Sequence, residues 1–294
     1  IGLQKTFSAS DYVTDSGASG TALATGKKTK NGSIGVDPQG KELKSILHYA
    51  EDNGYATGLV STSSILHATP ASFIAHNPDR HDYAELATDF LDTDIDVFIG
   101  GGKKYFADRE DGLNLVDTLK ERNYQVVYDL EKISQVKDGK LAGLTAENHN
   151  PRYSEDRKNM LPVSTQTALN ILDKNDKGFF LMVEGSQIDW GGHDNDPDYV
   201  VSELLDFNNA VKVGMEYARA HKNTLVIVTA DHECGGMALN GGNLQKHTID
   251  AAFTTDHHTG VMVPVFAFGP GAEEFMGVYD NTDIFKKMRK LYGF

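Results

Sequence analysis

The chain has 294 residues and a formal net charge of −14. That acidity argues against a protein that binds nucleic acid or an anionic membrane through basic patches, and an anionic substrate would need local positive charge, such as metal ions. The single cysteine, Cys234, excludes an internal disulfide framework and a cysteine-rich zinc module, so zinc would have to be held by carboxylates and by some of the eleven histidines.

Predicted strands and helices alternate along the chain. Apolar, β-branched runs predict buried strands at 56–62, 97–100, 125–128, 179–184, 224–229 and 263–268. Stretches with apolar residues at helical spacing predict helices at 41–53, 83–91, 113–122, 163–175, 197–220 and 283–291. This alternation predicts an α/β fold with a mostly parallel sheet, in one domain over residues 1–294. Residues 101–162 are the most charged and irregular in pattern, and we expect them to be a surface insertion.

No long apolar run and no charged-then-apolar leader is present, so we expect no membrane span and no secretion signal in this chain.

Near the start, Asp15 is a good N-cap candidate and small residues follow Ser16. If Ser16 opens a helix, the free backbone N–H groups and the helix dipole there would favour an approaching phosphate. Serine alone is a weak nucleophile, but coordination to a metal ion could activate it. The alternative is a capped helix that packs closely through glycine and alanine.

Acidic and imidazole side chains follow two of the predicted strands. Asp189 and His193 lie four residues apart after the strand at 179–184, and Asp231 and His232 follow the strand at 224–229. Ligands of parallel sheets bind beyond the carboxyl ends of the strands, so these groups are expected at one edge.

A third imidazole group, His257-His258, precedes the last strand. Mixed histidine and aspartate ligands suit zinc, whereas Glu184 and Thr69 offer only oxygen, which suits Mg²⁺. Any one of these groups alone could be an ordinary surface histidine beside an acid.

Together these residues resemble the alkaline phosphatase family along nearly the whole chain. The segment from Asp15 to Ser19 is similar to the family's nucleophile signature, which implies that Ser16 is the residue phosphorylated. The run His67-Ala68-Thr69-Pro70-Ala71 resembles the segment whose threonine supplies a hydroxyl to magnesium. Arg80 matches the arginine that clamps phosphate, and its planar fork fits two phosphate oxygens.

The resemblance also implies a ligand set for two zinc ions and one magnesium ion. Asp189, His193 and His258 match the first zinc, Asp231 and His232 match the second, and Glu184 and Thr69 match the magnesium. His258 fits better than His257 because of its spacing to Gly260. His67 and Trp190 stand where some bacterial members have Asp and Lys, and they resemble the marine, cold-environment and animal variants. These two residues would tune the third metal site.

One part of the family pattern has no counterpart. The family begins with an apolar strand whose terminal Asp bridges the second zinc and the magnesium, and none of the fifteen residues before Ser16 matches it. We expect the natural protein to carry this strand upstream of Ile1, the alternative being a defective protein. A missing central strand would leave a gap in the sheet.

The implied fold is a three-layer α/β/α sandwich, and the implied reaction is hydrolysis of phosphate monoesters to alcohol and inorganic phosphate through a phosphoserine. A broad substrate range, a homodimer and a periplasmic or extracellular location are implied in the same way. Two rivals stay open: a phosphodiesterase or phosphomutase of the same superfamily, against which the Ser16 neighbourhood argues, and a non-catalytic metal- or phosphate-binding protein.

Overall fold

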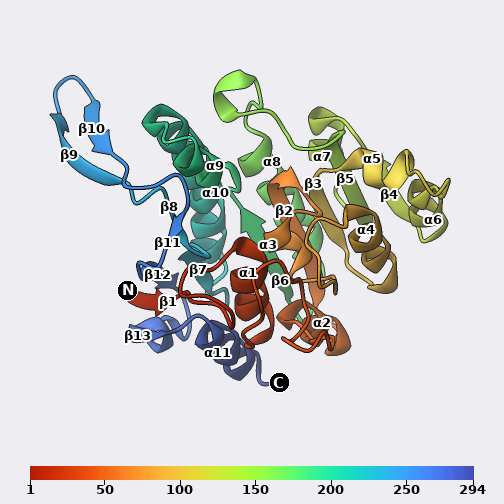
Figure 1. Ribbon diagram of the computed structural model, residues 1–294. Coiled ribbons are helices and arrows are strands. Elements are labelled where there is room, and N and C mark those ends of the chain that lie inside the picture. Colours follow the sequence, from red (N-terminus) through yellow and green to blue (C-terminus); the bar gives the residue numbers. More distant parts are fainter.

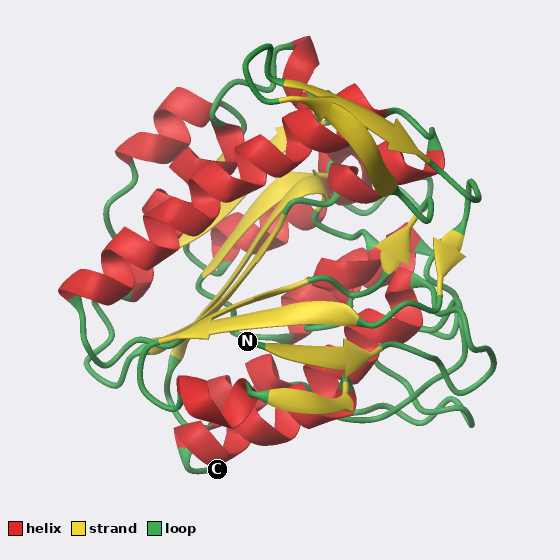
Figure 2. Ribbon diagram, turned by 90° about the vertical axis from the view of Figure 1, so that its left-hand side faces the viewer, coloured by secondary structure: helices red, strands yellow, loops and turns green.

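The computed structural model describes residues 1–294 and has a layered α/β architecture, with strands between two groups of helices (Figures 1 and 2). The main sheet has five strands in the order β4-β5-β3-β2-β6, and every pair in it is parallel. These strands are β2 (Ala56–Ser64), β3 (Val97–Gly101), β4 (Tyr124–Val127), β5 (Lys140–Ala146) and β6 (Phe179–Glu184). The predicted α/β fold with a mostly parallel sheet is therefore confirmed.

Successive side chains along the strands of the main sheet pack into two different hydrophobic cores, one on each face of the sheet. Leu59 and Phe98 belong to the larger core, whereas their neighbours Val60 and Ile99 belong to the smaller one. Such alternation is what a strand buried on both faces requires. The smaller core includes residues of α7 (Leu130–Gln135), α8 (Met160–Leu172) and α10 (Pro197–Ala220). The larger core includes residues of α1 (Ser16–Thr25), α2 (Ile46–Asp52), α3 (Ala68–Ala71), α4 (Tyr83–Asp92), α5 (Lys103–Ala107), α6 (Leu115–Glu121) and α11 (Thr282–Tyr292).

The last two predicted strands form, but in a second sheet with the order β13-β1-β12-β7. Here β7 (Val226–Thr229) and β12 (Val263–Phe268) are antiparallel, β1 (Gly2–Lys5) is antiparallel to β12, and β1 is parallel to β13 (Gly277–Asp280). No helix lies between β7 and β12, and a parallel pair would need such a crossover. Two short ribbons connect them instead, β8 (Glu233–Cys234) with β11 (His258–Thr259) and β9 (Ala238–Asn243) with β10 (Thr248–Ala252). The second ribbon projects from the body of the molecule (Figure 1).

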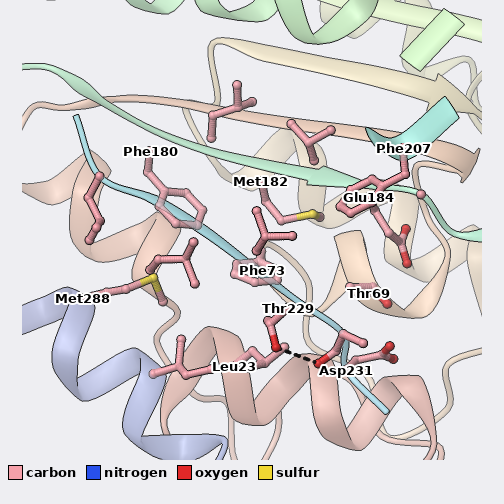
Figure 3. Close-up of a pocket in the computed structure, with 18 of the residues that line it drawn as sticks. Leu23, Thr69, Phe73, Phe180, Met182, Glu184, Phe207, Thr229, Asp231 and Met288 are labelled. Carbon is pink, nitrogen blue, oxygen red and sulfur yellow. Dashed lines mark hydrogen bonds between the residues drawn. The ribbon is translucent and has the colours of Figure 1, made fainter. Parts of the chain in front are cut away.

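A cavity of about 1380 Å³ lies between the two sheets. β6 pairs only with β2 and β7 pairs only with β12, so the other edge of each strand is unpaired, and residues of both strands line the cavity. Its walls are largely apolar and include Phe180, Met182 and Met288, and its polar end carries Glu184 and Asp231 (Figure 3). The gap in the sheet that the sequence led us to expect thus has a counterpart at this position.

Residues 101–162, expected to be an irregular surface insertion, consist largely of regular elements and contain the two outermost strands, β4 and β5, of one side of the main sheet. The sequence did not predict β5, which has few β-branched residues and becomes a strand by pairing with β3 and β4. None of the helices combines the length and the apolar character that crossing a membrane requires.

Candidate active site

Ser16 is the first residue of α1, as the sequence predicted, and only 5% of it is exposed. Asp15 is the N-cap, and its carboxylate accepts a hydrogen bond of 2.9 Å from the backbone N–H of Ala18. All ten residues of α1 are buried. The absence of a side chain at Gly17 permits this packing, because a Cβ there would lie 2.9 Å from the carbonyl oxygen of Ser33. The helix thus holds the Ser16 hydroxyl at a fixed point at the sheet edge.

His232 and Asp231 lie directly against this hydroxyl. The Ser16 Oγ is 3.1 Å from His232 Nε2, which is also 3.0 Å from Asp231 Oδ2. Burial lowers the pKa of His232, but the charge and hydrogen bond of Asp231 outweigh it and raise the pKa to about 9. Burial by itself would raise the pKa of Asp231, but the charge and hydrogen bond of His232 outweigh burial. The pKa of Asp231 is therefore below its usual value. In the absence of a metal ion these two groups form a buried ion pair.

Asp189, His193 and His258 converge a few ångströms away. The two imidazole Nε2 atoms are 3.1 Å apart, and each faces an Asp189 oxygen, at 3.5 Å for His193 and 3.3 Å for His258. The opposite nitrogen of each ring is 2.7–2.8 Å from a backbone carbonyl, of Asp256 for His193 and of Thr14 for His258. A carbonyl only accepts, so each Nδ1 carries the proton and donates it.

This arrangement points electron pairs at one another. When the Nδ1 proton is donated to a carbonyl, a ring in its neutral form turns an Nε2 lone pair toward the other ring and toward the carboxylate of Asp189. Asp189 Oδ1 is buried and accepts no hydrogen bond. His232 Nδ1, which lies 4.0 Å from this oxygen, is also buried and has no hydrogen-bond partner. Histidines oriented by a backbone carbonyl are the usual form of zinc ligands. The donor set therefore fits a divalent cation that would satisfy all these atoms at once.

Glu184, at the carboxyl end of β6, lies in a hydroxyl-rich setting. Its Oε2 accepts hydrogen bonds from Ser61 at 2.8 Å and from Ser186 at 2.6 Å. Burial raises the pKa of Glu184, and hydrogen bonds from Ser186, Ser61 and Thr69 lower it in part. Glu184, Thr69 and Asp231 lie near one another at the polar end of the cavity (Figure 3). These oxygen ligands are of the kind that Mg²⁺ prefers.

Arg80 and His67 form the other wall. Arg80 donates to Asp15 Oδ2 at 2.9 Å, and its second terminal nitrogen is 3.4 Å from His67 Nε2. Burial and the nearby Arg80 charge lower the pKa of His67 to about 3, so the ring is neutral. Trp190 lies edge-on to His67, with 6.0 Å between ring centroids. The residues predicted for this part of the site are thus brought together.

The structure adds two residues to the site that were not predicted from the sequence, and it leaves His257 outside the site. His149 lies 4.9 Å from Trp190 between ring centroids, and no sequence pattern marked it. Cys234 belongs to the group formed with Asp189, His193 and His258, and its place three residues after Asp231 was the available signal. The His257 side chain is 81% exposed and points away from this group, whereas that of His258 is 13% exposed.

Comparison with known proteins gives this geometry a family. The family model for alkaline phosphatase matches residues 1–249 and 238–294. The chain belongs to the alkaline phosphatase family. It is 38% identical to alkaline phosphatase 4 of Bacillus subtilis, over 93% of this chain and 75% of that protein, and 33% identical to the alkaline phosphatase of Escherichia coli, over 96% and 74%. Membership identifies the chain as a phosphatase that hydrolyses phosphate monoesters.

Solved structures of this family agree. The alkaline phosphatase of the Antarctic bacterium TAB5 superposes with a TM-score of 0.93 at 41% identity, over 100% of this chain and 88% of that one. A cold-active alkaline phosphatase from Shewanella superposes with a TM-score of 0.92 at 36% sequence identity, over 99% of this chain and 89% of that one. A variant of the TAB5 enzyme superposes with a TM-score of 0.93 at 40% sequence identity, over 100% of this chain and 88% of that one. That variant has magnesium bound in its M3 site.

Proposed function

We propose that this phosphatase works through a phosphoserine at Ser16. The hydroxyl of Ser16 attacks the phosphorus in line with the departing alcohol, and water then hydrolyses the phosphoserine to inorganic phosphate. The observation that carries this proposal is the position of Ser16. It opens a buried helix, and its oxygen lies 3.1 Å from His232 in the midst of the acid and imidazole groups. A fixed, buried hydroxyl with free helix N–H groups beside it suits attack on a phosphate.

The site residues divide into three ligand groups. Asp189, His193 and His258 would hold one zinc ion, Asp231 and His232 a second, and Glu184 with Thr69 a magnesium ion. When bound, such cations stabilise the negative charge on the attacking and departing oxygens. The magnesium in the M3 site of the TAB5 variant supports the third assignment.

The remaining residues bind and orient the substrate. Arg80 offers a planar fork for two non-transferred phosphate oxygens, and Asp15 holds the guanidinium in place at 2.9 Å. His67 and Trp190 pack edge-on against each other beside Arg80 and would tune the magnesium site. Recognition therefore centres on the phosphoryl group, and we infer a broad range of alcohol portions.

The decisive test is Ser16→Ala in the full chain. We expect turnover of an aryl phosphate to fall by on the order of 10³-fold or more, because only binding and charge stabilisation would remain. Zinc content should stay the same as in the parent. Ser154→Ala, at an exposed serine far along the chain, is the matched control and should retain activity. Unchanged hydrolysis by the Ser16 variant would refute the nucleophile assignment.

Beyond a single catalytic domain, three further properties are proposed on the family resemblance: a dimeric state, a location and an additional segment. We propose one catalytic domain that works as a homodimer in the periplasm or outside the cell. We also propose that an extended apolar segment ending in an acidic residue belongs between β6 and β7, because both strand edges facing the cavity there are unpaired. Sedimentation analysis and cell fractionation test the first two. Rapid amide exchange at these edges in the present chain tests the third.

A further inference from the structure

Cys234 lies opposite a predicted metal ligand. It belongs to β8, which lies beside β11 (Figure 1), and the antiparallel register of the two strands sets Cys234 directly against His258. Directly opposed residues of two antiparallel strands project their side chains on the same side of the ribbon. The register of this short ribbon therefore brings the thiol to the side on which the His258 imidazole lies.

The thiol is within coordinating range of the whole group. One ligand atom each from Asp189, His193, Cys234 and His258 lie within 4.8 Å of one another. The oxygen–nitrogen and nitrogen–nitrogen separations are 3.1–3.5 Å. A tetrahedral zinc ion with bonds of about 2.0–2.3 Å has its ligand atoms roughly 3.3–3.8 Å apart. The oxygen and nitrogen atoms already lie near these spacings, and the sulfur, within 4.8 Å of them, would move closer by at most about 1 Å to join them around one ion.

The neighbouring helix leaves room for the sulfur. Gly192 belongs to α9 (Gln187–His193), and a Cβ there would lie 2.9 Å from Cys234 Cβ and 3.0 Å from its Sγ. Any larger residue would push the cysteine out of the group. Two buried polar atoms nearby have no hydrogen-bond partner: Asp189 Oδ1, and Nδ1 of His232, a residue only 6% exposed, which lies 4.0 Å from it.

We propose that Cys234 supplies a thiolate as the fourth ligand of the cation held by Asp189, His193 and His258. This inference rests on the proposed metal site and adds a ligand to it. On coordination the thiol gives its proton to solvent and a sulfur–metal bond forms. Sulfur favours zinc, cobalt or cadmium over magnesium, so the site discriminates against hard ions. Four protein ligands also fill the tetrahedron, so phosphate must displace the sulfur or add as a fifth ligand.

Cobalt spectroscopy tests the proposal directly. The full chain is stripped with a chelator and titrated with Co²⁺, whose visible bands report binding and whose near-ultraviolet band reports thiolate coordination. Because Cys234 is the single cysteine, the near-ultraviolet band has one possible thiolate source. We expect the near-ultraviolet band to rise with the visible bands up to one equivalent, and a later rise of the visible bands alone would report the second group, Asp231 with His232. Cys234→Ser should keep the visible bands, lose the near-ultraviolet band and bind Zn²⁺ at least about 10-fold more weakly, measured by competition with a chromophoric chelator.

Two controls separate the possible outcomes. Met237→Leu removes the sulfur of another cavity residue and should leave the spectrum unchanged. Zn²⁺ should slow the reaction of Cys234 with an aromatic disulfide in the parent chain. Visible bands without the near-ultraviolet band in the parent would overturn the thiolate assignment and leave the metal site intact. The absence of all cobalt bands in the parent and in Cys234→Ser would overturn the metal site as well.

Discussion

The molecule contains two clusters of charged and imidazole side chains, one fully buried and one half-buried, that differ in how their charges are matched. In the first, Arg157 donates to Glu203 and, at 2.8 Å, to Asp206, and all three side chains are at most 1% exposed. In the second, Asp189, His193 and His258 turn acceptors toward one another. The first cluster pairs a cation with two anions from the chain itself. The second has anions and lone pairs for which the chain offers no sufficient cation.

This difference separates a structural cluster from a binding site. Buried charges are tolerated when they are paired, as in the Arg157 cluster, where each anion accepts from the guanidinium although Arg157 Nε and Asp206 Oδ1 have no hydrogen-bond partner. A half-buried group of acceptors is unfavourable by itself and becomes favourable when a cation enters. The presence of charged groups alone would not have distinguished the two clusters. The direction of each donor and acceptor does.

Metal removal gives the largest expected difference between the clusters. A strong chelator should lower phosphomonoesterase activity by about 10³-fold or more, which corresponds to several kcal/mol of transition-state stabilisation. Thermal unfolding should also move to lower temperature, since ligands of the native state stabilise it. Zinc plus magnesium should restore both. Full activity after verified metal removal would contradict the proposed role of the acceptor cluster.

Breaking the Arg157 cluster should affect stability and leave chemistry alone. Arg157→Met leaves Glu203 and Asp206 buried without a cation, which should lower the free energy of unfolding by about 3–5 kcal/mol in urea denaturation. Activity per folded molecule should not change. Replacing all three residues by apolar ones of similar size is the control and should recover most of the loss. A variant as stable as the parent would show that the cluster is not structural in this sense.

Arg80 joins the site to its substrate, and Arg80→Lys tests its geometry. Lysine keeps the charge but loses the planar fork, so we expect kcat/KM to fall by about 10²-fold with unchanged zinc content. Steady-state kinetics with an aryl phosphate would measure this. Lys120→Arg, which exchanges the same two residue types at an exposed helix position away from the site, is the control. A decrease no larger than in that control would argue against phosphate binding by Arg80.

Glu51 is a half-buried acid with no cationic partner and should give the smallest effect. Burial raises its pKa to about 7, although Thr57 donates a hydrogen bond of 3.0 Å to it. A folded pKa above the unfolded value of 4.5 means that stability is complete below that value and falls as the pH rises through about 7. Glu51→Gln should remove this fall, which is on the order of 2 kcal/mol, in unfolding curves at about pH 5 and pH 8. If the free energy of unfolding of Glu51→Gln fell equally between these two pH values, the fall would come from a group other than Glu51.

The site residues were predictable to the extent that their chemistry lies in short motifs. Asp15 with Ser16 and Asp231 with His232 are adjacent in sequence, and Asp189 with His193 are one helical turn apart. Such groups can be read directly from the chain. His149 could not be, because it reaches the site through the loop after β5. Cys234 had one sequence signal, its place three residues after Asp231, but only the pairing of β8 with β11 sets it opposite His258.

The sheet shows the same limit. β6 and β12 have the boundaries that the sequence predicted, because apolar residues with high strand propensity fill them. β5 was missed, since pairing on both sides makes it a strand despite its small residues. The separation of β7 and β12 into a second sheet also depends on partners remote in sequence.

The sequence by itself determined the alternation of strands and helices, the helix that Ser16 opens and the identity of most polar residues at the strand ends, because these depend on neighbours within one or two turns. The tertiary structure alone decided which lone pairs face each other, where the sheet is interrupted and that a cysteine stands opposite His258. Those features depend on distances between segments far apart in the chain, and these distances are set by packing and strand register.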